Sequence, residues 1–455
     1  MGHWLLATYC ALAGLAILQG VLVVVQTWEH HRFAFSRLSQ VSQYRQVGRA
    51  VLIVPCKGFD VGIESNLASF FRLDYHDYEI RFVVESDRDP VYPVIRRLMV
   101  RFPHVEARVI VAGVARDCGQ KVHNLRMATV DLDEDVRFLA FADSDARLRR
   151  PWLRGLLARL DEPDVGATTG YRWFVPARPS LANVLLHSIN SSIAVFFGAR
   201  PPTVVWGGSW AIRRETFDSL ALRDAWAGTL SDDLVASRLL QQARLRVLFE
   251  PACMVISPLD TTWRDLCAFV RRQYLMGRFY LPVWWAGVIL LVSLSNLVFF
   301  GSLVAAVAGF LAGASFAGTA AAVALVQYLV GVIGGLLRQD LVLTYFPRLR
   351  SRLRAARRFE VWAGPLVAFV NWMMLLGSMA GRRLAWRGIA YQVGRRGQVE
   401  AVWRAEAPDG PETPPSTEEA PAAADPGEGP IILPMANRDR EADPTAATPR
   451  RRRCA

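Results

Sequence analysis

The 455-residue chain has few charged side chains and few cysteines. Charged residues make up 21% of the sequence and hydrophobic residues 52%, a composition that excludes a disordered or collagen-like chain. The six cysteines lack the spacing of metal ligands, and the chain is too long for a small disulfide scaffold. We interpret them as free thiols in a reducing compartment. The composition instead suits one sizeable soluble domain joined to membrane segments.

Motifs of nucleic-acid-binding proteins are also absent. The net charge is +12, mostly from arginines near apolar runs, yet there is no zinc finger, basic zipper or aromatic RNA-binding motif. This charge pattern suits an anionic membrane surface better than DNA. We therefore expect a membrane partner and no nucleic acid, and an anionic nucleotide substrate remains open.

Long stretches without charge predict the membrane segments. Residues 1–28 contain no Lys, Arg, Asp or Glu, and their apolar run is long enough for an N-terminal transmembrane anchor. A signal peptide is the alternative, and the lack of a basic start disfavours it. Residues 279–337 carry no charge at all, which predicts two transmembrane helices over 281–337 with a Gly-rich turn between them.

The charges after position 337 predict how the chain lies in the membrane. Residues 338–360 hold seven arginines, and the positive-inside rule places this basic loop in the cytoplasm. The apolar segment 361–381 has arginines at both ends, so it is either a transmembrane or a re-entrant helix. The Pro-rich, acidic tail 404–455 is predicted to be disordered. An Arg-rich, Ala-rich chain without an organelle signal favours a multi-pass protein of a bacterial inner membrane with a cytoplasmic catalytic domain.

Residues 48–280 alternate β-branched runs with segments of helix length, as α/β domains do. The predicted strands at 51–55, 80–85, 105–111 and 136–142 are candidates for a parallel, Rossmann-like sheet. In such a sheet a nucleotide binds at the carboxyl ends of the strands.

Charged side chains stand at these strand ends. Lys57 follows the first strand, Glu85 ends the second, and Asp143 and Asp145 follow the fourth. Two carboxylates in this D-x-D spacing are hard oxygen donors that suit Mg²⁺ or Mn²⁺ bridging a diphosphate. A solvated turn is the alternative.

A second acidic pair, Asp232 and Asp233, precedes a helical stretch. One carboxylate can cap the helix, which leaves the other free to act as a general base on an acceptor hydroxyl. Upstream, the segment WGGSW at 206–210 suits a sugar platform, and a packed turn is the alternative.

Taken in order, these segments resemble glycosyltransferase family 2 and, within it, the ceramide glucosyltransferase-like branch of bacterial lipid glycosyltransferases. The resemblance implies a GT-A fold with transmembrane helices. It also implies an inverting transfer of a sugar, glucose or a related hexose, from a UDP-sugar to a lipid hydroxyl. The segments that carry the resemblance are VPCKGFD (54–60), NLASFFRLDYHDYEIRFVVESDRDP (66–90), VEARVIVAG (105–113), GQKVHNL (119–125), FADSDARL (141–148), TTGYRWFVP (168–176), VWGGSWAIRRETF (205–217), LSDDLVASRLL (230–240) and AWRGIAYQV (385–393).

The resemblance further implies roles for the donor-binding residues. Glu85, with Asp87 as an alternate, matches the acidic position that contacts the base and ribose, and Lys121 matches a lysine that approaches the nucleotide. Asp143 matches the residue that holds Mn²⁺ or Mg²⁺ with the diphosphate. Asp145 completes the D-x-D motif at the metal.

The catalytic roles follow in the same way. Asp233, with Asp232 beside it, matches the base that deprotonates the acceptor. The family's Q-x-x-R-W signature falls at 269–273, where Arg272 is kept but the glutamine and the tryptophan are replaced. Arg272 is expected to pair with the diphosphate, and a role as an interfacial arginine is the alternative.

Two other functions compete with lipid glycosylation. A processive polysaccharide synthase uses the signature tryptophan as part of its acceptor floor, so the loss of that residue disfavours it. A transporter should carry ionisable side chains inside its spans, whereas 279–337 has no charged residue. A membrane scaffold would not need Asp143, Asp145 and Asp233 together.

Overall fold

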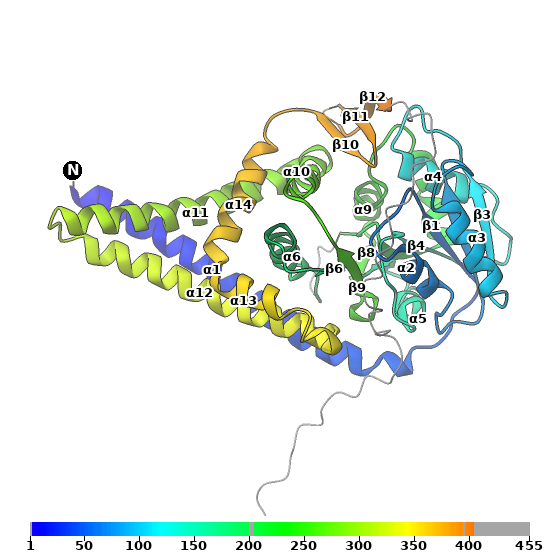
Figure 1. Cartoon of the computed structure of the whole chain (residues 1–455), viewed down its shortest axis with the longest axis horizontal. Helices are drawn as coiled ribbons and strands as arrows, with labels where there is room; N and C mark the ends of the chain where they lie inside the picture. Colours follow the sequence, from blue (N-terminus) through cyan, green and yellow to red (C-terminus); the bar gives the residue numbers. More distant parts are fainter. Residues whose placement is uncertain (1, 200–203, 395, 405–455) are drawn as a thin grey trace, which may run out of the picture.

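Two regions of different composition make up the structure, an α/β domain and a bundle of long apolar helices (Figure 1). The computed structural model describes residues 2–199, 204–394 and 396–404. The predicted disordered tail, 404–455, lies outside the described residues except for Arg404.

A seven-stranded sheet forms the centre of the α/β domain, with the strand order β3-β2-β1-β4-β7-β5-β8. The first four strands pair in parallel, as predicted, whereas β7 runs antiparallel to both β4 and β5. The sheet is therefore mixed. Its strands are β1 (Ala50–Pro55), β2 (Tyr78–Val84), β3 (Glu106–Val111), β4 (Phe138–Ala142), β5 (Val165–Thr169), β7 (Ser209–Arg213) and β8 (Arg246–Phe249).

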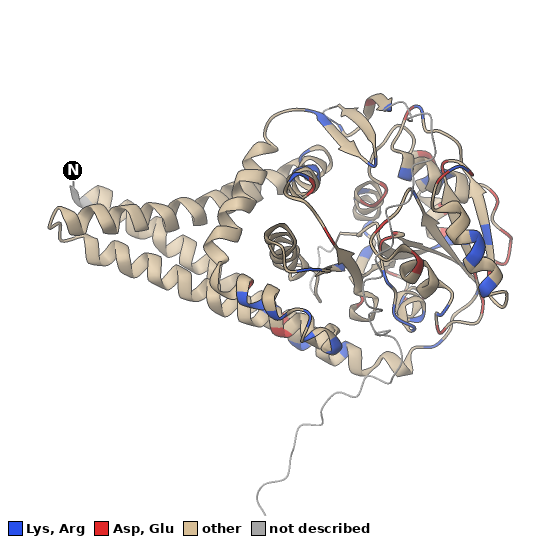
Figure 2. Cartoon of the chain, in the orientation of Figure 1, with Lys and Arg blue, Asp and Glu red and all other residues tan. Residues whose placement is uncertain are grey.

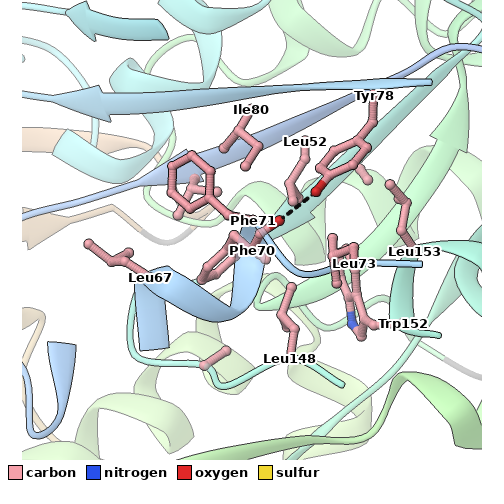
Figure 3. Close-up of a cluster of buried hydrophobic side chains, with 14 of the residues drawn as sticks. Leu52, Leu67, Phe70, Phe71, Leu73, Tyr78, Ile80, Leu148, Trp152 and Leu153 are labelled. Carbon is pink, nitrogen blue, oxygen red and sulfur yellow. Dashed lines mark hydrogen bonds between the residues drawn. The ribbon is translucent and has the colours of Figure 1, made fainter. Parts of the chain in front are cut away.

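Helices cover both faces of this sheet, which explains why β1 is a continuous apolar run rather than an alternating one. Leu52 faces a core formed with α2 (Ile63–Phe70), α3 (Tyr92–Arg101) and α5 (Trp152–Leu157). In Figure 3 the rings of Phe70, which ends α2, and of Phe71, which follows it, lie near Leu52, and the Tyr78 hydroxyl donates to the Phe70 carbonyl at 2.9 Å. Ile53 faces the opposite core. The helices on that side are α4 (Gln120–Ala128), α7 (Arg214–Ser219), α8 (Leu222–Ala225) and α9 (Asp232–Gln242).

A second layer of elements lies between the sheet and the long helices. The parallel strands β6 (Arg172–Pro176) and β9 (Val255–Leu259) form a separate two-stranded sheet. Next to it lie α6 (Leu181–Ala194) and α10 (Trp263–Tyr280) (Figure 1). Helix α10 leads directly into the membrane part of the chain.

Within the described part of the chain, three helices are long and apolar enough to cross a membrane, and they run side by side away from the α/β domain (Figure 1). They are α1 (Gly2–Ser39), α11 (Pro282–Leu311) and α12 (Ala317–Tyr345). Figure 2 shows almost no charge along them until α12 returns to the α/β domain. The two predicted helices after the α/β domain are thus present, and the anchor predicted over 1–28 is part of a longer helix that continues to Ser39.

The structure differs from the prediction after position 337. The expected loop 338–360 contains the end of α12, the short 3₁₀ helix η3 (Pro347–Leu349) and most of α13 (Arg354–Trp362). Helix α13 meets α14 (Gly364–Gly377) at a bend of 81°. Such a pair is either a broken span or a re-entrant element, so both predicted alternatives for 361–381 stand.

The C-terminal described segment forms a three-stranded antiparallel sheet that the sequence did not predict. Its strands are β10 (Arg383–Trp386), β11 (Ile389–Val393) and β12 (Val399–Arg404). The β10–β11 loop consists of Arg387 and Gly388, both with positive φ (52° and 73°), as a type I′ hairpin requires. Leu384 and Tyr391 pack into the core of the α/β domain. This packing brings the chain back to the sheet after the membrane helices.

Candidate active site

The strand order brings the predicted donor-binding residues together. Strands β1, β2 and β4 are neighbours, and their carboxyl ends meet at one edge of the sheet. There Lys57 Nζ lies 2.7 Å from Glu85 Oε2, and Arg404 Nη1 from the C-terminal sheet lies 2.5 Å from Glu85 Oε1. Burial alone would raise the pKa of Glu85, but the hydrogen bonds from Lys57 and Arg404 lower it.

Asp143 and Asp145 share one cation at the end of β4. The guanidinium of Arg172 lies 2.9 Å from Asp143 Oδ2 and 3.0 Å from Asp145 Oδ2. Lys121 Nζ from α4 lies 2.9 Å from Asp143 Oδ1. Burial would raise the pKa of Asp143, but Lys121 and Arg172 lower it. Asp143 is therefore a carboxylate at neutral pH, and Asp145 keeps one buried oxygen, Oδ1, without a hydrogen-bond partner.

The second acidic pair, Asp232 and Asp233, begins α9, and the two carboxylates have different surroundings. Asp233 accepts hydrogen bonds from the Ser231 hydroxyl (2.6 Å), the Leu234 amide (2.8 Å) and the Gly207 amide (2.8 Å), so its carboxylate is firmly oriented. It is only partly buried, whereas Asp232 is buried and has an unpaired Oδ2. Burial raises the pKa of Asp232 to about 7, opposed by Lys121 at 3.3 Å and reinforced by Asp233.

The backbone at Gly207 and Gly208 approaches these carboxylates too closely for a side chain. A Cβ at Gly208 would lie 2.6 Å from Asp143 Oδ2 and against the ring of Trp206. A Cβ at Gly207 would lie 2.9 Å from Asp232 Oδ2. The two glycines thus allow the β7 loop to pass between the carboxylates, which explains their place in the WGGSW segment.

Arg272 from α10 faces the same carboxylates without an ion pair of its own in the described part of the chain. Its guanidinium lies 5.2 Å from the Phe269 ring centroid and 5.1 Å from that of Trp386. Burial lowers its pKa to about 10, and the nearby Arg172 and Arg387 add to the effect. A partly buried cation among other cations would be stabilised by a bound anion.

Several residues of the site were not predicted. Asp60 lies near the D-x-D carboxylates, and Arg387 Nη2 lies 2.5 Å from its Oδ1. Burial raises the pKa of Asp60, Arg387 opposes this shift, and the charge of Asp145 adds to it. Arg172 and Arg387 stand in segments that the resemblance includes, but nothing in the sequence shows that their side chains converge with Asp143. Only the β10–β11 hairpin, which follows the membrane helices, brings Arg387 back.

One cavity of about 1790 Å³ contains most of these groups. Six predicted site residues line it. Glu85 does not line it but contacts Lys57, which does, and Asp87 is exposed and does not line it. From the carboxylates the cavity extends along α6 and α10 to apolar side chains of α1, α11 and α12. The six residues are Lys121, Asp143, Asp145, Asp232, Asp233 and Arg272.

The described residues contain no group of three or more His, Cys, Asp or Glu side chains arranged to hold a metal. Asp143 and Asp145 can supply two carboxylates, and the unpaired Oδ1 of Asp145 is a free ligand atom. Mg²⁺ is commonly held by one or two carboxylates together with substrate phosphates and water. The residues present therefore fit a divalent ion that arrives with a diphosphate.

The sequence profile of glycosyl transferase family 21 matches residues 10–399, from the first long helix to the C-terminal sheet. The chain belongs to glycosyl transferase family 21. The predicted glycosyltransferase character and the α/β-plus-membrane-helix architecture are thus confirmed, and the matching family is family 21.

Curated relatives of the chain include ceramide glucosyltransferases. Ceramide glucosyltransferase 1 of Caenorhabditis elegans is 34% identical over 77 residues, which cover 17% of this chain and 16% of the relative. The ceramide glucosyltransferase of Komagataella phaffii is 37% identical over 76 residues, or 17% of this chain and 15% of the relative. These matches span about a sixth of the relatives' length.

Two solved structures show a distant likeness to the chain. The mannosyltransferase PcManGT from Pyrobaculum calidifontis, solved with GDP-Man and Mn²⁺, is 18% identical with a TM-score of 0.38, and the match covers 80% of this chain and 99% of that one. A glucosyl-3-phosphoglycerate synthase from Mycobacterium tuberculosis has a TM-score of 0.30 at 13% identity over 51% of this chain and 79% of that one.

Proposed function

We propose that the protein is an inverting, membrane-bound glycosyltransferase with a GT-A catalytic domain, which moves a hexose from a UDP-sugar to the hydroxyl of a lipid. The observation that carries this proposal is that one continuous cavity extends from the cluster of carboxylates and arginines to the apolar membrane helices. A nucleotide sugar suits the charged end and a lipid suits the apolar end. The glycosidic bond would form where the two meet.

The charged end supports a donor site for a nucleotide diphosphate. Arg272 lines the cavity and has no ion pair of its own among the described residues. We assign it to the diphosphate, with Lys121 beside it. Glu85, held by Lys57 and Arg404, is assigned to the base and ribose, and Asp87 remains the alternate.

A divalent cation, Mn²⁺ or Mg²⁺, is proposed at Asp143 and Asp145. When bound, it would neutralise the charge that develops on the leaving diphosphate. Arg172 now bridges both carboxylates, so it must move when an ion binds. If no ion binds, the Arg172 guanidinium would itself supply the positive charge beside the diphosphate.

Asp233 is the base in this proposal because it is oriented by three hydrogen bonds and is partly open to the cavity. It takes the proton of the acceptor hydroxyl as the hydroxyl oxygen bonds to the anomeric carbon. The bond from that carbon to the diphosphate oxygen breaks on the opposite face, and UDP leaves with the electron pair. Asp232 is buried, so we assign it to positioning Lys121.

The arrangement of the chain in the membrane follows from the same proposal. We propose a cytoplasmic catalytic domain, because the arginines of 338–360 favour the cytoplasm for the adjoining end of the bundle. We propose a multi-pass protein of a bacterial inner membrane within a ceramide glucosyltransferase-like branch related to family 2.

The test uses membranes that contain the full chain, a panel of radiolabelled UDP-sugars, and Mn²⁺, Mg²⁺ or a chelator. We expect label in one organic-extractable lipid, lost in Asp233→Asn. Label in insoluble polymer would indicate a polysaccharide synthase. No Asp233-dependent label from any donor, with folding verified, would favour a transporter or scaffold. Undiminished transfer with the chelator would assign the role of the metal to Arg172 and its neighbours.

A further inference from the structure

Three amide side chains lie within the apolar helices and line the cavity. They are Gln19 in α1, Asn296 in α11 and Gln327 in α12. The side-chain carbonyl oxygen of each is buried and has no hydrogen-bond partner. Leaving a polar group unpaired in hydrocarbon costs free energy, and polar side chains inside spans commonly mark a functional site.

The three amides lie at one level of the bundle. Ala16, Val298 and Val323 pack together in one cluster, and each amide lies a few residues from a member of it. At a rise of 1.5 Å per residue, Gln19, Asn296 and Gln327 lie about 4.5, 3 and 6 Å from that level. All three are displaced toward the α/β domain, because α1 and α12 run toward it and α11 runs away from it (Figure 1).

Asn296 is the clearest member of the group. Its side chain is 4% exposed, and its amide nitrogen donates to the Val292 carbonyl at 2.9 Å, so the unpaired oxygen is what remains for a ligand. Other polar groups of these helices do find partners within the protein. The Tyr9 hydroxyl lies 2.9 Å from Ser302 Oγ, for example.

We propose that these three carbonyl oxygens form an amide subsite that binds a hydroxyl or an amide N–H in the hydrocarbon part of the acceptor lipid. This inference rests on the proposed function, because it assumes that the acceptor occupies the cavity. Asn296 lies 14 residues into α11, about 21 Å from its start, within a hydrocarbon core of about 30 Å. The bound group is therefore distinct from the hydroxyl that receives the sugar.

The chemistry of the subsite selects the ligand class. Three acceptor oxygens require a hydrogen-bond donor, and α11 offers no charge to pair with an ionised group. An unsubstituted alkyl chain would leave all three oxygens unpaired. The preferred acceptors are thus lipids that carry a hydroxyl or amide within the chain.

The test measures lipid retention by the purified full chain in detergent, using native mass spectrometry. The probes are stearoyl ceramide and a series of hydroxystearoyl ceramides whose hydroxyl is placed at successive chain positions. We expect the wild type to retain one isomer about fivefold better than stearoyl ceramide, which corresponds to one net hydrogen bond. The double variant Asn296→Leu, Gln327→Met should lose this preference and still retain stearoyl ceramide.

Controls separate a binding role from a structural one. Ser295→Ala changes a neighbouring cavity residue and should leave the preference intact. Gln327→Met alone keeps the chain length and must lower the preference even if Asn296→Leu fails to fold. Equal retention of every isomer by the wild type, or a preference that survives the double variant, overturns the subsite. Failure to retain any ceramide overturns the ceramide-like acceptor site itself.

Discussion

At the sheet edge, Lys121 and Arg172 each contact two carboxylates within 3.3 Å, whereas at the membrane end of the same cavity three amide oxygens have no partner at all. Most carboxylates at the charged end already have ion-pair partners, so a donor must exchange some of them, although Asp145 Oδ1 and Asp232 Oδ2 are unpaired. The membrane end is unsatisfied, so a ligand adds hydrogen bonds without displacing any. The donor end should therefore be sensitive to charge and pH, and the lipid end to hydrogen-bonding capacity.

The largest expected effect is the loss of the base. Asp233→Asn should lower kcat by about 10²–10⁴-fold, the usual contribution of general base catalysis. Its single amide oxygen can accept from either the Gly207 or the Leu234 amide but not from both, so folding is checked beside activity. The measurement is transfer from the UDP-sugar that the wild type uses. Asp218→Asn, an exposed carboxylate in α7, is the matched control and should stay near wild type. Equal losses in both variants would remove Asp233 from the mechanism.

The second largest effect is expected from adding a side chain at Gly208, next to Asp143. Gly208→Ala places a Cβ 2.6 Å from Asp143 Oδ2, and overpacking of this kind destabilises by about 1–3 kcal/mol. We expect a lower Tm together with a loss of activity. Gly287→Ala in α11 meets nothing within 4 Å and should change neither. An unchanged Tm for Gly208→Ala would mean that the loop is looser than described.

A smaller effect is expected from Arg272→Met, which should weaken donor binding without changing the chemical step. Arg272→Met removes the cation assigned to the diphosphate, so the KM for the nucleotide sugar should rise about tenfold or more, as the loss of a hydrogen bond to a charged group implies. Arg271→Met is the matched control, because that guanidinium binds backbone carbonyls of 377 and 380 instead. A fall in kcat at unchanged KM would contradict the assignment.

The smallest effect is a pH dependence. The folded pKa of Asp232 is about 7, above the usual value of 3.8, so the folded state binds more protons than the unfolded state between these pH values. The contribution of Asp232 to stability must then fall as pH rises through this window. In Tm measurements from pH 4.5 to 8, Asp232→Asn should show a shallower fall than wild type. Parallel curves for the two proteins would mean that the pKa of Asp232 is not raised.

The charged end of the cavity could be largely predicted from the sequence. Lys57, Glu85 and Asp143 stand at the ends of β-branched runs, and the order of a doubly wound sheet brings such ends together. Arg172 and Arg387 could not be placed in this way. Arg387 reaches Asp60 because the β10–β11 hairpin packs back onto the α/β domain after α11, α12 and the bent pair α13 and α14. Neither the sequence spacing of Arg387 nor the hydrophobic periodicity around it predicts this packing.

The membrane end could be predicted only in outline. Hydropathy identifies α1, α11 and α12, because length and lack of charge suffice for that. It does not show that Gln19, Asn296 and Gln327 share one level, since their relative height depends on how three separate helices pack. The antiparallel β7 was missed for a similar reason, because strand direction is set by long-range pairing.

The most direct test of the joined cavity is photocrosslinking with a ceramide that carries a diazirine in its acyl chain. After incubation with the UDP-sugar, we predict adducts on the cavity-lining side of α11, at residues such as Val292 and Phe299, and hexose on the crosslinked lipid in wild type but not in Asp233→Asn. Adducts confined to the outward-facing Leu290 and Leu297, without hexose, would contradict the claim that lipid and donor meet in one cavity.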